Sequence, residues 1–314
     1  MKNKAMTTVI LSSMAVGVLH LSNRFITATS TVRGLLNKHN GNYYTWRFGN
    51  IYYTKSGSGT PLLLLHDTNP CSSSYEWSQL VRKLSVRHTV YTLDLLGCGR
   101  SDKPNITYTN FIYVQLISDF IKNVIGGKTD VAATGLTGSY IIMACHNTPE
   151  LFNKIMLINP EDPCFLSCAP GNHSRIRKFI LELPIIGTTV YHLLTRKENV
   201  EYLFSEKYFY NPFYLNSKYS DLFYESAHLG GSGGKYLLAS MNGLYLNINI
   251  NKALSEINNS IFITAGKHCE NIDRILKNYC ELNPAIEAEI ISNAKYLPQL
   301  EVSEELYEKM NIFF

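Results

Sequence analysis

Short apolar runs alternate with helical stretches along the chain after residue 40, and this rhythm restricts the fold more than any other feature. Four largely apolar runs have the character of strands buried on both faces: Leu62–His66, Thr89–Leu93, Val131–Thr134 and Lys154–Ile158. Helical stretches lie between or after them: Trp77–Leu84, Phe111–Ile125 and Ser139–His146. Because such alternation implies right-handed crossovers, the sequence predicts the α/β class, with a mostly parallel sheet and helices on both faces.

The rhythm is interrupted once, by a segment rich in Tyr and Phe. Residues 161–252 contain no convincing buried strand, so we expect a helical insertion there. Two strands joined by a Gly49-Asn50 turn are predicted before the four runs, at Tyr43–Phe48 and Ile51–Lys55. After the insertion we expect strands at Ser260–Ala265 and near Ala288–Ser292, and then a C-terminal helix, Ser303–Phe314.

Charge is distributed unevenly and argues against a nucleic-acid-binding protein. Residues 1–66 contain seven Lys or Arg and no acidic residue, whereas residues 67–314 contain 22 basic and 25 acidic residues. A nucleic-acid binder needs a basic face on its folded body, and this body is slightly acidic. The hydrophobic content of 45% is sufficient for a sizeable packed core. We therefore expect a globular protein with no nucleic-acid partner.

The seven cysteines do not form a metal-binding pattern. They are scattered, and none belongs to a CxxC pair or to a Cys/His spacing typical of zinc sites. An odd number of cysteines is more consistent with buried thiols in a reducing compartment than with a disulfide framework. We expect no metal and no cofactor, and a body that is cytoplasmic.

The N-terminal segment, residues 1–40, is distinct from the remainder of the chain. Ala5–Asn23 contains no charged residue and has Lys2 and Lys4 before it and Arg24 after it, but only 11 of its 19 residues are Ala, Val, Ile, Leu or Met. Three interpretations stay open: an uncleaved membrane anchor, a cleaved signal peptide and an amphipathic surface segment. We favour the anchor, which makes the protein membrane-associated.

The residues that follow the predicted strands resemble those of the α/β-hydrolase family. Leu62–Asp67 is similar to the family's apolar strand followed by His-Gly, and Asp94–Pro104 matches its D-x-x-G-x-G-x-S-x-x-P loop. Pro298–Glu301 matches the segment before the final helix. The resemblance covers residues 41–314. It implies an α/β-hydrolase fold in which residues 161–252 form the cap domain over the active-site pocket.

This resemblance places unusual residues at the three positions of the catalytic triad. The strand-to-helix turn reads Gly135-Leu136-Thr137-Gly138-Ser139, so Thr137 stands at the position of the family's nucleophilic Ser. A second register of the same turn puts Gly135 at its tip and leaves no nucleophile. Cys269 stands at the acid position, between His268 and Glu270, and Tyr296 stands at the position of the catalytic His.

These three residues predict that serine-hydrolase chemistry is absent or feeble. A Thr hydroxyl attacks only if a neighbouring base removes its proton, and a neutral Tyr, with a pKa of ~10, cannot accept that proton as imidazole does. Cys269 supplies no carboxylate to orient a base. The resemblance assigns the oxyanion hole and the pocket to a further set of residues: His66, Asp67, Leu136, Gly138 and Cys98. A negative charge on Asp67 there would oppose a developing oxyanion.

Other chemistry stays possible at the same sheet edge. His268 paired with Cys98 or Cys71 could perform thiolate chemistry, with Glu270 nearby. The alternative interpretation is structural: His66 bonds the backbone, Cys98 is a small residue of the pocket lining, and His268 lies on a surface loop.

Two main functions therefore stay open. The first is a membrane-tethered pseudoenzyme that binds a small apolar ligand or a protein partner. The alternative is an active hydrolase of ester or related bonds with a non-standard site, and a purely structural role is a third possibility. Ten Tyr and Phe residues between positions 202 and 224 would form either an apolar lid over the pocket or the core of the cap.

Overall fold

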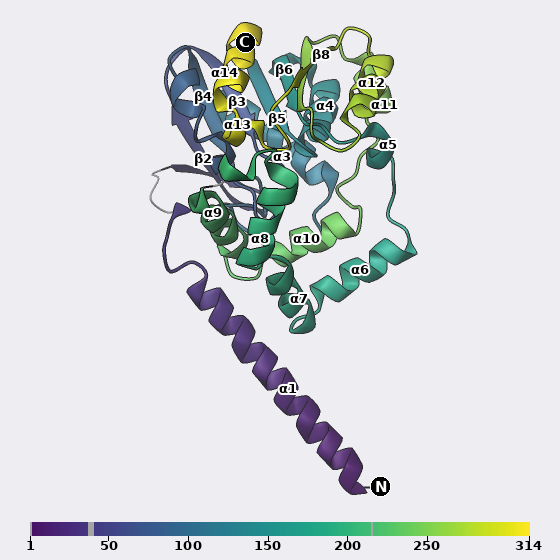
Figure 1. Cartoon of the computed structure of the whole chain (residues 1–314). Helices are drawn as coiled ribbons and strands as arrows, with labels where there is room; N and C mark the ends of the chain where they lie inside the picture. Colours follow the sequence, from purple (N-terminus) through teal and green to yellow (C-terminus); the bar gives the residue numbers. More distant parts are fainter. Residues whose placement is uncertain (1, 37–40, 215) are drawn as a thin grey trace.

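A computed structural model describes residues 2–36, 41–214 and 216–314, and it contains an eight-stranded sheet (Figure 1). The strand order is β1-β2-β4-β3-β5-β6-β7-β8, in which β2 is antiparallel to both neighbours and all other adjacent pairs are parallel. The strands are β1 Asn42–Trp46, β2 Gly49–Ser56, β3 Thr60–Leu65, β4 His88–Leu93, β5 Thr129–Thr134, β6 Phe152–Ile158, β7 Ile261–Gly266 and β8 Glu287–Ile291. The predicted fold class is confirmed.

Helices cover both faces of this sheet because the central strands are apolar on both sides. Along β3, Leu63 and Leu65 belong to one hydrophobic core, and Leu62 and Leu64 belong to the other. The first core is closed by α3 Asn110–Phe120 with its extension η3 Ile121–Ile125, α4 Thr137–Asn147 and α12 Ile272–Leu282. The second is closed by η2 Ser74–Trp77, α2 Val81–Leu84, α13 Pro298–Glu301 and α14 Ser303–Phe313.

Two local predictions need correction. The turn between β1 and β2 consists of Arg47 and Phe48, because Trp46 pairs directly with Gly49; the sequence had suggested Gly49-Asn50. The helix expected over residues 77–84 is divided into η2 and α2, and the Ser73 side chain accepts a hydrogen bond from the Tyr75 N–H at the start of η2.

The helical insertion between β6 and β7 packs around its own aromatic residues. Its α-helices are α5 Pro163–Leu166, α6 Asn172–Glu182, α7 Ile186–Leu194, α8 Lys197–Leu203, α9 Ser217–His228, α10 Gly234–Asn242 and α11 Asn251–Glu256. Phe204, Phe209 and Phe223 are fully buried or nearly so, in one cluster that also contains Leu297 and Leu300 from the main domain. These aromatic side chains therefore form the core of the cap and fasten it to the body.

The N-terminal helix α1, Lys2–Thr29, extends away from the cap end of the molecule (Figure 1). Its C-terminal part is attached to α7: the Asn23 amide donates to the Ile185 carbonyl at 3.2 Å, and Thr27 Oγ1 lies 3.4 Å from His192 Nε2. The Glu225 carboxylate then accepts the backbone N–H groups of Leu35 and Leu36, both at 2.9 Å. Among the residues whose placement is described, no helix combines the length and the hydropathy that a membrane-spanning segment requires. The N-terminal anchor stays a prediction.

The loop after β4 is held by a buried ion pair. Arg100 Nε lies 2.8 Å from Asp94 Oδ2, and the Ser74 N–H donates to Asp94 Oδ1 at 2.7 Å. Burial alone would raise the pKa of Asp94, but the adjacent Arg100 guanidinium lowers that pKa to about 2. The motif recognised in the sequence at residues 94–104 therefore serves to fix this loop at the sheet edge beside the candidate site.

Candidate active site

The strand-to-helix turn after β5 has Gly135 at its tip. Gly135 adopts φ +55°, in the left-handed region that favours glycine, and α4 begins two residues later at Thr137. The family's nucleophile elbow is a sharp, strained turn at this position. The structure therefore favours the second register of the turn, in which Gly135 stands at the tip and Thr137 begins α4.

Thr137 is buried beneath the site and is not presented to a substrate. Its hydroxyl donates to the His66 carbonyl at 2.8 Å and shares a 2.8 Å hydrogen bond with the Thr68 hydroxyl. Gly138 follows in the first turn of α4, against the side chain of Leu157. Both residues therefore position the start of the helix, and the turn itself carries no hydroxyl or thiol at its tip.

The Asp67 carboxylate accepts two backbone N–H groups at the place where the family's oxyanion hole is expected. Asp67 Oδ1 accepts the backbone N–H of Leu136 at 2.9 Å and that of Thr68 at 2.8 Å. These are the two donors expected of an oxyanion hole in this fold: the residue after the nucleophile position and a residue of the loop after β3. The donors that would stabilise a developing negative charge are already satisfied by a side chain of the protein itself.

Tyr296 completes this arrangement from the position of the catalytic His. Its hydroxyl donates to Asp67 Oδ2 at 2.9 Å. Burial, followed by the nearby Asp67 charge, holds the pKa of Tyr296 well above its ordinary value, so Tyr296 acts as a hydrogen-bond donor. Burial also raises the pKa of Asp67, although the Tyr296 hydroxyl and the two N–H groups oppose that change.

Asn159, which the sequence motifs did not single out, brings the other two triad positions together. It follows β6 directly and has φ +46°, a conformation that Asn tolerates better than most residues. Its amide nitrogen donates to the carbonyls of Lys295 and Tyr296 at 3.0 and 2.9 Å, and its oxygen accepts from the Cys269 thiol at 3.3 Å. Burial raises the pKa of Cys269 to about 12, so this residue supplies a neutral thiol where the family has a carboxylate.

The remaining predicted residues have structural roles or lie at the surface. His66 Nδ1 lies 2.7 Å from the Asp67 carbonyl and its Nε2 accepts the Leu95 N–H at 3.0 Å; burial lowers its pKa to about 4. The Cys98 thiol donates to the Asn69 carbonyl at 3.3 Å, and burial raises its pKa. His268 is exposed and stacks on Tyr210 with ring centroids 3.7 Å apart.

The structure therefore does not form the proposed thiolate site. Burial raises the pKa of Cys71 to about 12, and this residue packs in the aromatic cluster of the cap. Within the described parts of the chain, no hydrogen bond joins a cysteine to a histidine, because the thiols at this sheet edge are bonded to Asn groups or packed among apolar side chains. A thiolate at neutral pH is disfavoured at each of these cysteines.

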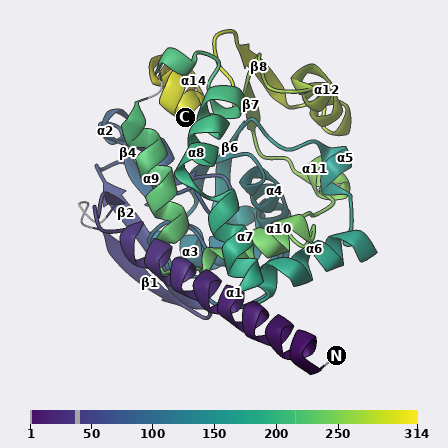
Figure 2. The same cartoon turned by 60° about the horizontal axis from the view of Figure 1, so that its bottom comes forward.

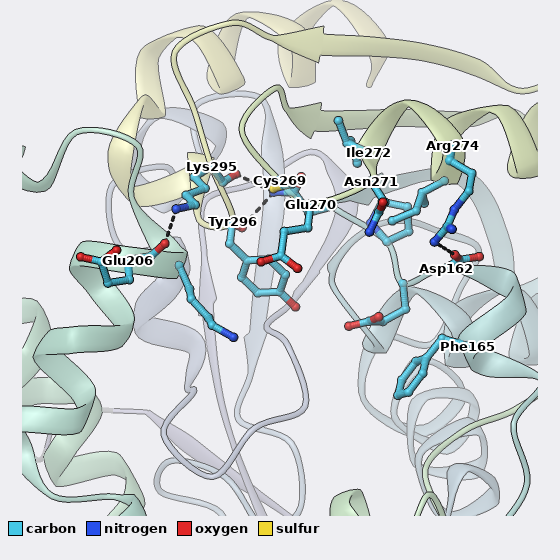
Figure 3. A pocket seen from close by; sticks show the side chains of 15 residues that line it. Asp162, Phe165, Glu206, Cys269, Glu270, Asn271, Ile272, Arg274, Lys295 and Tyr296 are labelled. Carbon is cyan, nitrogen blue, oxygen red and sulfur yellow. Dashed lines mark hydrogen bonds and ion pairs between the residues drawn. The ribbon is translucent and has the colours of Figure 1, made fainter.

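A pocket of about 410 Å³ opens beside Tyr296 and Cys269 (Figure 3). Figure 3 shows Tyr296, Cys269 and Glu270 on one side of it and Phe165, Asp162 and Arg274 on the other. Arg274 is paired with Asp162 at 2.8 Å. Thr137 and Asp67 do not line this pocket, whereas Asn159 and Glu161 do. No group of three or more His, Cys, Asp or Glu within the described ranges could hold a metal ion.

Glu161 is the second lining residue that the sequence motifs did not identify. Burial raises its pKa to about 7, and the nearby Asp67 and Asp162 carboxylates add to this effect. Among the described residues, none forms a hydrogen bond or an ion pair with the Glu161 carboxylate. A signal was present in the sequence. Glu161 and Asp162 are the third and fourth residues after β6, at the edge of the sheet where ligands bind.

Comparison with known proteins identifies relatives of this chain. A model of the alpha/beta hydrolase family matches residues 62–244. The 2-hydroxy-6-oxo-6-(2'-aminophenyl)hexa-2,4-dienoic acid hydrolase of Metapseudomonas resinovorans is 28% identical over 108 residues, which are 34% of this chain and 37% of that protein. The chain thus spans about a third of the length of the curated relatives that it matches.

Solved structures share the fold at low identity. The epoxide hydrolase CorEH superposes with a TM-score of 0.72 at 18% identity, over 88% of this chain and 98% of that chain. A membrane phospholipase A, described as a bacterial virulence factor, gives a TM-score of 0.69 at 20% identity, over 100% of this chain and 98% of that chain. Since the family model covers more than half of the sequence and the eight-stranded sheet agrees with it, the chain belongs to the α/β-hydrolase family.

Proposed function

We propose that this α/β hydrolase homologue does not hydrolyse esters and instead binds a small molecule in the pocket beside Tyr296. One observation supports this most strongly: the Asp67 carboxylate accepts both oxyanion-hole N–H groups beside a turn whose tip is Gly135. Without a hydroxyl or thiol at the tip, the turn offers no side chain on which an acyl-enzyme could form. A carboxylate in the oxyanion hole also removes the largest electrostatic contribution to acyl transfer.

The pocket lining supports a ligand with an apolar part and a positively charged group. Phe165, Ile272 and Tyr296 offer apolar and aromatic surface, which agrees with the apolar ligand expected from the sequence. Glu161 adds a carboxylate that no described side chain neutralises, and Glu270 adds a second. An ammonium group satisfies a desolvated carboxylate and is attracted by aromatic faces. The preferred ligand class is therefore an organic amine.

Purified full-length protein is expected to hydrolyse p-nitrophenyl acetate and butyrate no faster than buffer and to resist labelling by a fluorophosphonate probe. The physical reason is the missing nucleophile at Gly135. The measurement is release of p-nitrophenol, with the Tyr296→Phe and Asp67→Asn variants as matched controls. Turnover above the buffer rate that either variant abolishes would establish the alternative function, an active hydrolase with a non-standard site.

Binding of organic amines is expected to depend on Glu161. In a thermal-shift and calorimetric screen, primary and quaternary ammonium compounds should bind in preference to their neutral isosteres. The Glu161→Gln variant should weaken binding about 10-fold, the typical effect of losing one charge-assisted contact. Because the carboxylate is ionised above its pKa of about 7, affinity should rise from pH 6 to pH 8 in the wild type and stay flat in the variant.

The control for this screen is Ile290→Trp on β8, which leaves the pocket lining unchanged. It should bind the same compounds as the wild type. The Ile275→Trp variant, which adds bulk to the lining, should lose them. Equal affinity for amines and neutral isosteres would contradict the assignment of an amine, and hits that survive Ile275→Trp would move the binding site elsewhere.

A further inference from the structure

Three helices at the cap end of the molecule present aliphatic side chains to solvent. Figures 1 and 2 place α1, α6 and α7 together, and Figure 1 shows them at the end opposite to α14 and the C-terminus. Hydrogen bonds from Asn23 to the Ile185 carbonyl and to Thr189 attach α1 to α7. The three helices belong to one surface, which we call the cap-end surface.

Helix α6 exposes its apolar stripe and buries the opposite side. Ile176, Phe179 and Ile180 are 56%, 64% and 42% exposed. Their i, i+3, i+4 spacing puts them on one face of the helix. Ser174 and Leu181 are buried on the other face, where α6 packs against the cap. A surface helix normally directs such a stripe toward the core, so this helix is inverted.

Helix α7 shows the same inversion. Ile186, Leu193 and Leu194 are exposed, whereas the polar side chains of Thr188 and His192 are buried. The neighbouring buried Tyr191 hydroxyl donates to the Ala227 carbonyl at 2.5 Å. Polar groups inside and aliphatic groups outside make the outer face of α7 suited to a nonaqueous environment.

Helix α1 adds a long apolar face of its own. Exposed large side chains recur at helical spacing along it: Ile10, Met14, Val18, Leu21 and Phe25. Asn23 and Thr27, which contact α7, lie on a different side of the helix. The apolar face is therefore left uncovered by the cap.

Charge identifies the partner of this surface. The sequences of α1, α6 and α7 contain six Lys or Arg residues and a single acidic residue, Glu182, which is paired with Lys178 at 2.6 Å. The exposed Arg175 and Arg177 lie on either side of the apolar stripe of α6. Aliphatic side chains bordered by basic ones match the boundary between acyl chains and anionic headgroups.

We propose that the cap-end surface docks on an anionic phospholipid membrane, with the apolar sides of α6 and α7 in the headgroup and acyl boundary. This inference goes beyond the proposed small-molecule binding and does not depend on it. A second copy of the chain fits less well, because the two surfaces would bring like charges together. A lipid bilayer of opposite charge meets both requirements of the surface, the apolar and the electrostatic.

The experiment uses one added tryptophan as a reporter in the full-length chain. Phe179→Trp places an indole on the exposed stripe, and the two native tryptophans, Trp46 and Trp77, are buried. With vesicles of phosphatidylcholine and phosphatidylglycerol, the Phe179→Trp emission should shift to the blue and be quenched by brominated lipids. The matched control is Ile312→Trp, at an exposed position on α14 at the opposite end, which should show neither change.

Two further measurements make the outcome decisive. The Arg175→Gln/Arg177→Gln variant should bind these vesicles several-fold more weakly than the wild type, and the difference should vanish at high salt. The absence of a blue shift in Phe179→Trp would overturn the proposal even if the chain sedimented with vesicles, since α1 alone could then account for binding. A shift that depends on protein concentration without lipid would also overturn it and assign the surface to a second copy.

Discussion

The Gly135→Ser variant is expected to lose about 3 kcal/mol of unfolding free energy, although it places a Ser at the tip of the turn. A Cβ atom at Gly135 would lie 2.4 Å from both Asp67 Oδ1 and the Tyr296 hydroxyl. A non-glycine residue must also adopt φ +55° there, which costs about 1–2 kcal/mol. The close approach to two hydrogen-bonded polar groups adds about 1–3 kcal/mol. Urea unfolding followed by circular dichroism measures the loss.

The chain offers a control that separates these two contributions. Gly126 also has a positive φ, +78°, but nothing lies within 4 Å of the position its Cβ would take. Gly126→Ser should therefore cost only about 1 kcal/mol, the conformational part. In the Asp67→Gly/Tyr296→Phe background, Gly135→Ser should approach the same value, since the crowding groups are gone. An equal cost of Gly135→Ser in both backgrounds would contradict direct crowding.

Because of this coupling, we do not expect a single substitution at Gly135 to produce a hydrolase. Asp67, Tyr296 and Gly135 are mutually adapted: the small residue leaves space for the Tyr296–Asp67 hydrogen bond, and that hydrogen bond fills the space of a nucleophile and its oxyanion. Changing one member disturbs the other two. The residues at these three positions therefore form one packed unit and have to be considered together.

The sheet could be predicted from the sequence because its strands are continuous apolar runs. The side chains of Leu62 to Leu65 alternate between the two cores. Four consecutive leucines are typical of a parallel strand that is buried on both faces. The motif at Asp94–Pro104 indicated the family for a similar reason. Its glycines adopt positive φ values and its Asp94–Arg100 ion pair is buried, so one loop conformation needs all of these residues. Local pattern and global fold agree in these segments.

The candidate site was predicted less completely because its geometry depends on contacts between distant segments. The turn of residues 135–139 admits two registers as a sequence, and only the positive φ of Gly135 selects between them. Asp67 was suspected as an obstacle to an oxyanion, but the sequence could not show that its carboxylate reaches the Leu136 N–H. Asn159 and Glu161 carry no motif, and they join the pocket through the approach of β6 to the loop before α13.

Another buried carboxyl group, that of Glu76, lies behind the site and is expected to affect stability rather than binding. Glu76 is fully buried, and its Oε2 accepts from the Gln299 amide at 3.2 Å and from the Thr134 hydroxyl at 3.4 Å. Burial raises its pKa to about 8, and the nearby Asp67 charge adds to the increase. The folded protein therefore holds a proton on Glu76 at neutral pH that the unfolded chain releases above its ordinary pKa of 4.5.

The contribution of Glu76 to wild-type stability is consequently expected to fall as pH rises from about 4.5 to 8, because at this group the unfolded state binds fewer protons than the folded state in that window. Relative to the wild type, Glu76→Gln should gain about 3 kcal/mol of unfolding free energy between pH 4.5 and pH 7, since each pKa unit corresponds to 1.36 kcal/mol. Urea unfolding at pH 4.5, 6, 7 and 8 tests this. Thr264→Val, a buried and non-titrating change on β7, should differ from the wild type by the same amount at every pH. If the stability difference between Glu76→Gln and the wild type is also the same at every pH, Glu76 is ionised in the folded protein and neighbouring groups stabilise its charge.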